Sequence, residues 1–221
     1  MSQSTTSLPH ANAPVFHTGA PLAEAELVII LNHGRGSTAD NILGLAPAIT
    51  PEEDAGAKIA FLAPQADGNV WYPQPFRQPL ASNEPWLTGA LATIDRIVDL
   101  VRAETPDRKI VVGGFSQGAC LSLEYLARGS REISGVAAFS GALIGPSISD
   151  RQAIPTLDGR WVFLGCGDRD SYFTIDVAED SVAALKAAGA ETEFRQYPGM
   201  GHTIVEDETN AVRAKIASLL P

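Results

Sequence analysis

This 221-residue sequence has few cysteines, few basic residues and no long apolar run. Its 2 cysteines do not suggest a disulfide framework in a chain of this size. The 16 Lys and Arg against 26 Asp and Glu give a formal net charge of -10, which disfavours binding to phosphate backbones and anionic lipid. Residues 1–14 lack the basic cluster and apolar core of a secretory signal, and no apolar run reaches transmembrane length. We therefore expect a cytoplasmic protein without nucleic-acid or membrane partners.

The rest of the composition fits one folded domain. The chain is 45% hydrophobic, which is enough for one sizeable core at this length. Glycine and proline are spread along the sequence, and no repeat or low-complexity linker is evident. We predict a flexible N-terminal tail at residues 1–14 and a single domain at residues 15–221.

Short continuous apolar runs alternate with longer segments that have helical spacing. The runs predict strands at 27–31, 58–63, 135–139, 161–164 and 193–197. A further strand is predicted from residue 110 to the glycines at 113 and 114. The segments between them predict helices at 39–49, 87–104, from Ser116 to about 127, 175–188 and 205–220. Continuous apolar strands that alternate with helices predict an α/β fold, with a mostly parallel central sheet covered by helices on both faces.

A long loop rich in proline and aromatic residues is predicted at residues 64–86. A loop of this length in a compact domain is usually functional, often as a lid over a site. The alternative is that its aromatic residues only anchor the loop to the body of the domain. The sequence leaves both interpretations open.

The segment Gly114-Phe115-Ser116-Gln117-Gly118 lies between a predicted strand and a predicted helix and matches the pattern Gly-x-Ser-x-Gly. The two glycines leave room for a tight turn in which a strained serine points its hydroxyl away from the sheet. Ser116 is therefore a candidate nucleophile. The simpler alternative is a glycine-rich turn in which Ser116 caps the following helix.

A nucleophilic serine needs a neighbouring base, and the base needs a carboxylate that orients it. His202 follows the last predicted strand, from where it can reach over the sheet towards Ser116. Asp168 and Asp170 follow the strand at 161–164, and the order serine, aspartate, histidine is that of α/β hydrolases. The residues themselves do not separate the two aspartates, and we expect the unused one to bond nearby amides in a turn. The other histidines lie in or beside the tail or in an early loop: His10, His17 and His33.

The loop His33-Gly34-Arg35-Gly36 follows the first buried strand. Its backbone N–H groups, together with that of Gln117, are candidates for an oxyanion hole. We interpret His33 as a residue that fixes this loop through hydrogen bonds. For Arg35 we favour a role of the backbone amide alone, and the alternative is that its side chain also contacts an acidic substrate.

Four segments together resemble the phospholipase/carboxylesterase family of small, capless serine α/β hydrolases, which includes acyl-protein thioesterases and bacterial carboxylesterases. They are Leu31-Asn32-His33-Gly34, Gly113-Gly114-Phe115-Ser116-Gln117-Gly118-Ala119, Gly167-Asp168-Arg169-Asp170 and Gly199-Met200-Gly201-His202, within a resemblance from about Leu27 to Leu220. The resemblance implies Ser116 as nucleophile and His202 as base. It implies Asp170 as the acid, because the family's acid ends a Gly-x-x-Asp pattern. It also assigns the oxyanion amides to Arg35 and Gln117, and it leaves a homodimer open.

The sequence departs from the family in ways that bear on the substrate. Ser171-Tyr172-Phe173-Thr174 stands where members often carry an aliphatic–proline pair, and Arg35 stands where thioesterase members are often apolar. Trp71-Tyr72-Pro73 looks more like the bacterial esterase branch. These differences predict a short acyl pocket. The residues expected to line it, unless each packs only its own loop, are Trp71, Tyr72, Phe139, Tyr172, Phe173 and Met200.

The function predicted from the sequence is that of a serine carboxylesterase. We expect it to hydrolyse small to medium acyl esters through an acyl-enzyme, with a small-molecule ester as partner and neither cofactor nor metal. An acyl-thioesterase or lysophospholipase with the same triad is the first alternative. A non-catalytic binding protein on a hydrolase scaffold is the second, because a fold does not determine a function.

Overall fold

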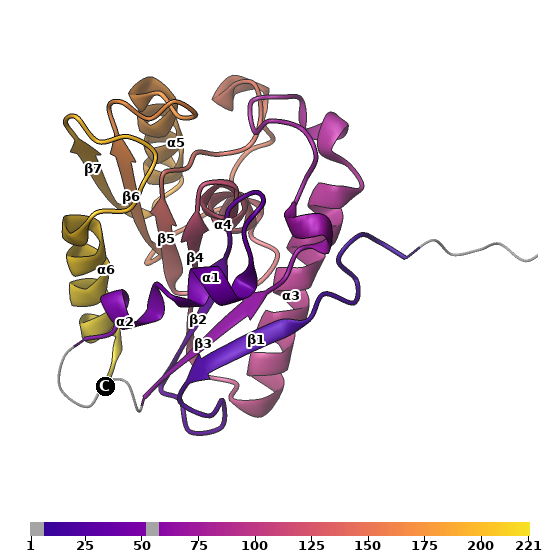
Figure 1. The fold of residues 1–221 in the computed structure, drawn as a ribbon, viewed down its shortest axis with the longest axis vertical. Helices are drawn as coiled ribbons and strands as arrows, with labels where there is room; N and C mark the ends of the chain where they lie inside the picture. Colours follow the sequence, from indigo (N-terminus) through magenta and orange to yellow (C-terminus); the bar gives the residue numbers. More distant parts are fainter. Residues whose placement is uncertain (1–6, 52–57) are drawn as a thin grey trace, which may run out of the picture.

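The computed structural model describes residues 7–51 and 58–221, which form one sheet between two layers of helices (Figure 1). Within these residues the sheet has seven strands: β1 (Val15–Gly19), β2 (Leu27–Asn32), β3 (Ile59–Pro64), β4 (Lys109–Phe115), β5 (Gly135–Phe139), β6 (Trp161–Gly167) and β7 (Glu191–Tyr197). Their order across the sheet is β1-β3-β2-β4-β5-β6-β7. Strand β1 is antiparallel to β3, and the other neighbouring pairs are parallel. The predicted α/β architecture is confirmed.

Helices cover both faces of the sheet (Figure 1). They are α1 (Ala39–Leu43), α2 (Ala46–Ile49), α3 (Trp86–Glu104), α4 (Gln117–Arg128), α5 (Ile175–Ala187) and α6 (Glu206–Leu219). Helices α3, α4 and α5 pack on one face, and α1, α2 and α6 pack on the other. In the described part of the chain, no helix combines the length and the apolar character needed to cross a bilayer.

Strand β2 shows why the strand sequences are continuously apolar. Successive side chains of a strand point to opposite faces of the sheet. Val28 and Ile30 belong to the core under α3, α4 and α5, whereas Leu27, Ile29 and Leu31 belong to the core under α1, α2 and α6. All five side chains are buried. A strand with a core on each face needs an apolar residue at every position.

Two elements differ from the sequence prediction. The single helix expected at 39–49 is divided into α1 and α2, and Pro47 lies in the first turn of α2. Proline has no N–H and its ring collides with the carbonyl four residues earlier, so one continuous helix cannot pass through this position. Strand β1 was not predicted, because all five of its residues are exposed and give no apolar run.

The N-terminal segment is docked onto the domain from His10 onward. The predicted flexible tail covers 1–14, of which residues 1–6 lie outside the described part of the chain. His10 is fully buried, and its backbone N–H donates to Asp67 Oδ2 at 2.6 Å. Its ring Nδ1 accepts from the Asp67 N–H at 2.9 Å, and Nε2 donates to the Trp71 carbonyl at 3.0 Å. The ring therefore joins the segment to the long loop in a neutral form.

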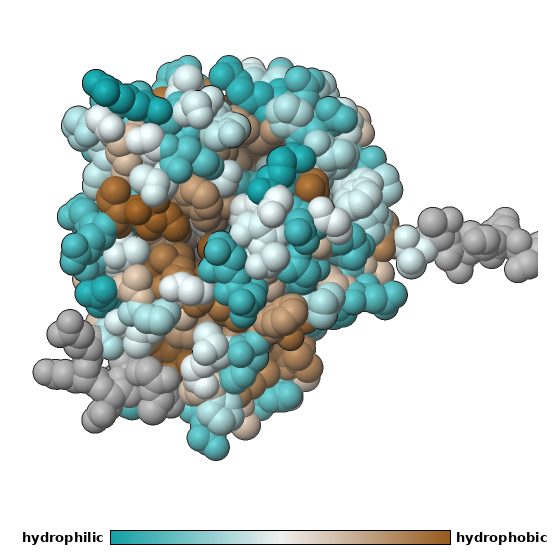
Figure 2. All heavy atoms as spheres, in the orientation of Figure 1, coloured by the Kyte–Doolittle hydropathy of each residue, from teal (hydrophilic) through white to brown (hydrophobic). Residues whose placement is uncertain are grey.

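On the face drawn in Figure 2, hydrophilic residues cover much of the surface, and apolar residues gather in patches between them. Large apolar side chains that are exposed within the described residues are Leu8, Val15, Phe16, Leu100 and Tyr172. Of these, Tyr172 lies two residues after Asp170, one of the two candidate acids.

We predict that His10 makes the stability of the fold depend on pH in the acid range. Burial lowers the pKa of His10 below the ordinary histidine value. The unfolded chain therefore binds a proton at a higher pH than the folded chain, and this contribution to stability is lost as pH falls below about 6.5. The difference in free energy of unfolding between wild type and His10→Gln should shrink between about pH 7 and pH 5, by at most about 1.4 kcal/mol per pH unit. Urea titrations at several pH values measure it, and a constant or growing difference would contradict a neutral, buried His10.

Candidate active site

The candidate site lies at the point where the order of the sheet changes direction. From β2 the chain continues to β3 on one side, whereas β4 starts the series that runs to β7 on the other side. At such a point the loops after the two strands diverge and leave a crevice at the carboxyl ends. Asn32, the last residue of β2, pairs with Gly114 of β4. The loop that begins at His33 and the turn at Ser116 therefore start side by side.

Ser116 is held in a strained turn between β4 and α4. Its backbone has φ 57° and ψ -118°, a conformation that is unfavourable for a residue with a side chain. Its N–H donates to the Phe139 carbonyl at 3.0 Å, and its carbonyl accepts from the Cys120 N–H at 3.0 Å. The side chain makes no capping hydrogen bond to α4. Instead its Oγ lies 2.9 Å from His202 Nε2, so the simpler interpretation as a helix cap does not hold.

The two glycines of the motif are required by the close passage of α4 over the end of β2. A Cβ atom at Gly114 or at Gly118 would overlap the carbonyl oxygen of Asn32. The contact is fixed by polar groups as well, because Asn32 Nδ2 donates to Ser122 Oγ at 3.0 Å, and this hydroxyl donates to the Gly118 carbonyl at 2.7 Å. The first turn of α4 is thus locked against the strand whose loop faces Ser116.

His202 connects Ser116 to a buried carboxylate. Its Nδ1 lies 2.7 Å from Asp170 Oδ2, and the other carboxylate oxygen accepts from the N–H groups of Tyr172 at 2.8 Å and Phe173 at 3.1 Å. Asp170 is only 8% exposed, so these hydrogen bonds replace water around its charge. A carboxylate at Nδ1 favours the tautomer that carries its proton there, which leaves Nε2 free to accept from the serine hydroxyl.

Asp168 has a different role from Asp170. It is exposed, and its Oδ1 accepts from the Gly199 N–H at 2.6 Å. In the same region the Arg169 N–H donates to the Met200 carbonyl at 3.0 Å. Asp168 therefore holds the loop after β6 against the loop that carries His202. This is the turn role expected of the aspartate that does not contact the histidine.

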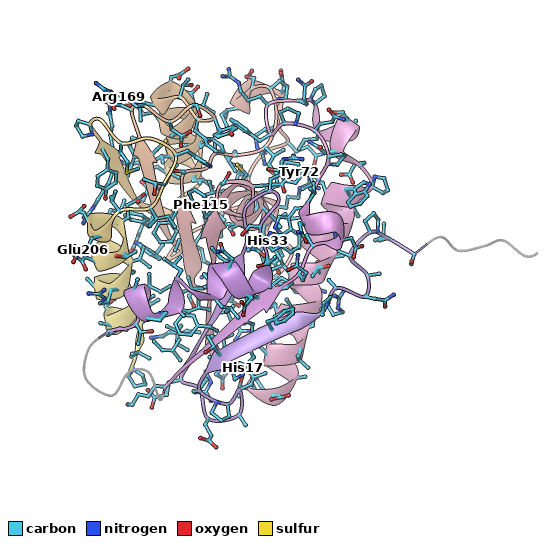
Figure 3. The ribbon with its side chains drawn as sticks, viewed as in Figure 1. His17, His33, Tyr72, Phe115, Arg169 and Glu206 are labelled. Carbon is cyan, nitrogen blue, oxygen red and sulfur yellow. The ribbon has the colours of Figure 1, made fainter. Side chains whose placement is uncertain are left out.

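The other histidines make structural hydrogen bonds. His33 Nδ1 donates to the Gly34 carbonyl at 2.8 Å, and its Nε2 accepts from the Ala66 N–H at 3.1 Å. Burial lowers the pKa of His33, which keeps this pattern of one donor and one acceptor. His17 is exposed on β1 and its Nε2 bonds to the Ala20 carbonyl at 2.7 Å. Figure 3 shows His33 near the carboxyl end of the sheet and His17 on β1, away from it.

Two backbone N–H groups near Ser116 are available to a ligand. In the described part of the chain, neither the Arg35 nor the Gln117 N–H donates to another protein group. The Gln117 N–H also begins α4, where the helix dipole favours negative charge. The Arg35 side chain is engaged elsewhere: its guanidinium donates to the carbonyls of Tyr72 at 2.9 Å, Pro73 at 3.0 Å and Gln74 at 3.1 Å. This engagement favours the interpretation in which only the Arg35 amide faces a substrate.

A cavity of about 590 Å³ opens beside Ser116 and His202. The long loop contributes the wall residues Tyr72, Pro73, Pro75 and Phe76. Phe115, Tyr172 and Phe173 also line it, and Phe173 stacks on Phe76 of the long loop. Polar residues line part of it as well: Arg35, Ser37, Asn41 and Gln117. The wall is mainly aromatic and apolar, so the cavity suits an apolar group of a substrate.

Three of the six residues predicted to line the pocket do so, and three do not. Tyr72, Tyr172 and Phe173 line the cavity. Trp71 is buried behind it, and its indole N–H donates to the His33 carbonyl at 2.9 Å. The other two are also buried and lie outside the wall: Phe139 in the core with Phe163, and Met200 against Gly167.

Sequence reasoning did not select two aromatic residues that lie at the site. Phe115 packs on His202 with ring centroids 4.7 Å apart, and Phe76 stacks on Phe173 at 4.7 Å. Tyr172, which is 68% exposed, also contacts His202, with ring centroids 4.8 Å apart. The signal that could have identified Phe115 is its place next to Ser116, and Phe76 lies in the proline-rich loop.

The sheet and the serine turn between β4 and α4, with a histidine and an aspartate after later strands, define the α/β-hydrolase fold. Residues 14–220 match the family model described as Phospholipase/Carboxylesterase. The chain therefore belongs to the phospholipase/carboxylesterase family, as the sequence motifs predicted.

Individual relatives agree with this assignment. A phospholipase/carboxylesterase structure from Dyadobacter fermentans is 34% identical, with a TM-score of 0.83 over 93% of this chain and 96% of that chain. A probable carboxylesterase of Oryza sativa is 28% identical over 64% of this chain and 55% of its own length. Acyl-protein thioesterase 1 of Neurospora crassa is 28% identical over 56% of this chain and 53% of its own length. The match thus spans little more than half the length of these two curated relatives.

Proposed function

We propose that this chain is a serine carboxylesterase that hydrolyses small to medium acyl esters through an acyl-enzyme. The observation that carries the proposal is the continuous chain of hydrogen bonds from Asp170 through His202 to Ser116, at 2.7 and 2.9 Å. Ser116, at the end of this series of hydrogen bonds, faces a cavity with a mainly apolar wall. Nucleophile, base and orienting acid within hydrogen-bond reach of one another are what acyl transfer requires.

In the proposed reaction His202 Nε2 takes the proton of the Ser116 hydroxyl as Oγ bonds to the carbonyl carbon of the ester. The backbone N–H groups of Arg35 and Gln117 stabilise the negative charge on the carbonyl oxygen. The tetrahedral intermediate then breaks its bond to the leaving oxygen, which receives the proton from His202. Water, deprotonated by the same histidine, attacks the acyl-serine and releases the acid, and the proton returns to Ser116.

The residues that line the cavity support the proposal that the substrates are uncharged and of limited length. Its wall is mainly aromatic, and the guanidinium of Arg35, which also lines it, donates its hydrogen bonds to loop carbonyls. Phe76 and Phe173 stack in this wall and take space that a long acyl chain would need. A thioesterase or lysophospholipase with the same triad is the second candidate, favoured by the thioesterase among the relatives. Three further statements stay predictions from the sequence. They are a cytoplasmic location, no nucleic-acid or membrane partner, and a possible homodimer.

Ser116→Ala should keep the fold and lose nearly all hydrolysis, because the proposed acyl-enzyme forms on the hydroxyl that this substitution removes. Residues of such a triad act as a unit, so we expect kcat to fall by about 10⁴-fold or more. The measurement is the steady-state rate on an activated short-chain aryl ester, with circular dichroism as the control for folding. A folded variant that keeps more than about a tenth of the wild-type rate would mean that Ser116 is not the nucleophile.

Asp170→Asn and Asp168→Asn form a matched pair. Asp170→Asn should lower kcat by up to about 10⁴-fold, because an amide no longer fixes the histidine tautomer. Asp168→Asn should change kcat much less, because this side chain only accepts from a backbone N–H in a turn. The kcat of both variants on one ester shows which aspartate is the acid. A larger loss in Asp168→Asn than in Asp170→Asn would assign the acid to Asp168.

A chain-length series tests the substrate class. Each methylene that a pocket buries contributes about 0.8 kcal/mol, so a long groove gives a kcat/KM that rises steadily with chain length. We expect instead an early plateau or fall, with short to medium esters preferred over palmitoyl-length ones. The series should be run with oxygen and sulfur esters side by side. A kcat/KM that climbs to the longest soluble esters, or a strong preference for sulfur esters, would favour the second candidate.

A further inference from the structure

The two residues that provide N–H groups to the proposed oxyanion hole both use their side chains to hold one segment, Trp71–Gln74. The Gln117 side chain is buried, and both ends of its amide are used. Its Oε1 accepts from the Trp71 N–H at 3.0 Å, and its Nε2 donates to the Tyr72 carbonyl at 2.8 Å. Because donor and acceptor are both engaged, the amide has a single orientation.

Arg35 holds the next residues of the same segment. Its guanidinium donates to three successive carbonyls, those of Tyr72, Pro73 and Gln74, at 2.9 to 3.1 Å. A planar guanidinium can span several acceptors in a fixed geometry, whereas an ammonium group acts as a single point of charge. The Arg35 side chain therefore fixes the distance between its own backbone and the loop, although the residue itself is exposed.

The Trp71–Gln74 segment is in turn fixed to the body of the domain. The Trp71 indole donates to the His33 carbonyl at 2.9 Å, and the Trp71 carbonyl accepts from His10 at 3.0 Å. At the other end the Gln74 N–H donates to the buried side chain of Asn83 at 2.8 Å. Hydrogen bonds at both ends therefore hold the segment in place, and a side chain that binds to it is held in place as well.

We propose that the Trp71–Gln74 segment positions the oxyanion hole, with the Arg35 and Gln117 side chains as the positioning residues. The inference rests on the proposed function. Oxyanion donors act only when they lie at hydrogen-bond distance from the place that the oxyanion will occupy, so small shifts of either backbone matter. Because Tyr72 and Pro73 also line the cavity, one segment links the shape of the acyl pocket to the stabilisation of the transition state.

The test uses side-chain substitutions that keep both backbone N–H groups: Arg35→Lys and Gln117→Met. Each should lower kcat by about 10- to 100-fold on a neutral short-chain ester, as small misplacements at a reacting centre do. KM should stay within about threefold, since the aromatic residues of the cavity wall are unchanged. The Ki of a trifluoromethyl ketone, which forms a tetrahedral oxyanion on the serine, should rise by the factor by which kcat/KM falls. Arg131→Lys, at an exposed pair with Asp99 away from the site, is the matched control and should change none of these.

The outcomes separate this inference from the proposed function. A wild-type protein without ester or thioester hydrolysis would overturn the proposed function, and the inference with it. In an active protein, unchanged kcat in both variants, or a loss of kcat without a parallel rise in ketone Ki, would overturn the inference alone. So would an Arg35→Lys effect confined to the KM of an ester that carries a carboxylate, since that result would make Arg35 a substrate contact. Arg35 is exposed, so its variant decides the matter even if Gln117→Met does not fold.

Discussion

The close approach of helix α4 to the carboxyl end of β2 is the contact on which the rest of the site depends. It is possible only because Gly118 has no side chain to meet the Asn32 carbonyl. The approach turns the chain sharply between β4 and α4 and places Ser116 at positive φ, with its hydroxyl directed to His202. It also brings the first N–H of α4 beside the loop that carries Arg35. One steric constraint thus determines the geometry of Ser116, the proposed nucleophile, and of the proposed anion site together.

Two neutral histidines, His10 and His33, connect the long loop, whose residues line the cavity, to the rest of the domain. His10 and His33 are buried, and each donates from one ring nitrogen and accepts at the other. Both bind the backbone of the long loop near Trp71, a loop that has little regular structure of its own. Burial lowers the pKa of both rings, so both keep this pattern of hydrogen bonds at neutral pH. The loop is therefore anchored to the body of the domain, and it also lines the cavity; a function of the loop stays a prediction.

The strands and helices that follow from local patterns of apolar residues were predicted from the sequence, and so was the approach of side chains that follow neighbouring strand ends. Strand β5 has the bounds expected from its apolar run, and the hydrogen bonds join Ser116 and His202 as their places after parallel strands suggested. The sequence did not predict β1, whose exposed residues pair with β3 through a long-range contact. It also misplaced Phe139, since the face to which a strand residue points depends on register. Between the two aspartates only the family pattern could choose, because loop geometry decides which carboxylate turns inward.

In the proposed mechanism, the fold makes one serine, Ser116, nucleophilic. The most direct measurement is to react the folded protein with a fluorophosphonate, digest it and locate the adduct by mass spectrometry. A parallel sample is reacted in urea, where the turn and its hydrogen bonds are absent. We expect an adduct on Ser116 alone in the folded protein and almost none in the unfolded one. An adduct on another residue, or equal labelling of Ser116 in both samples, would contradict it.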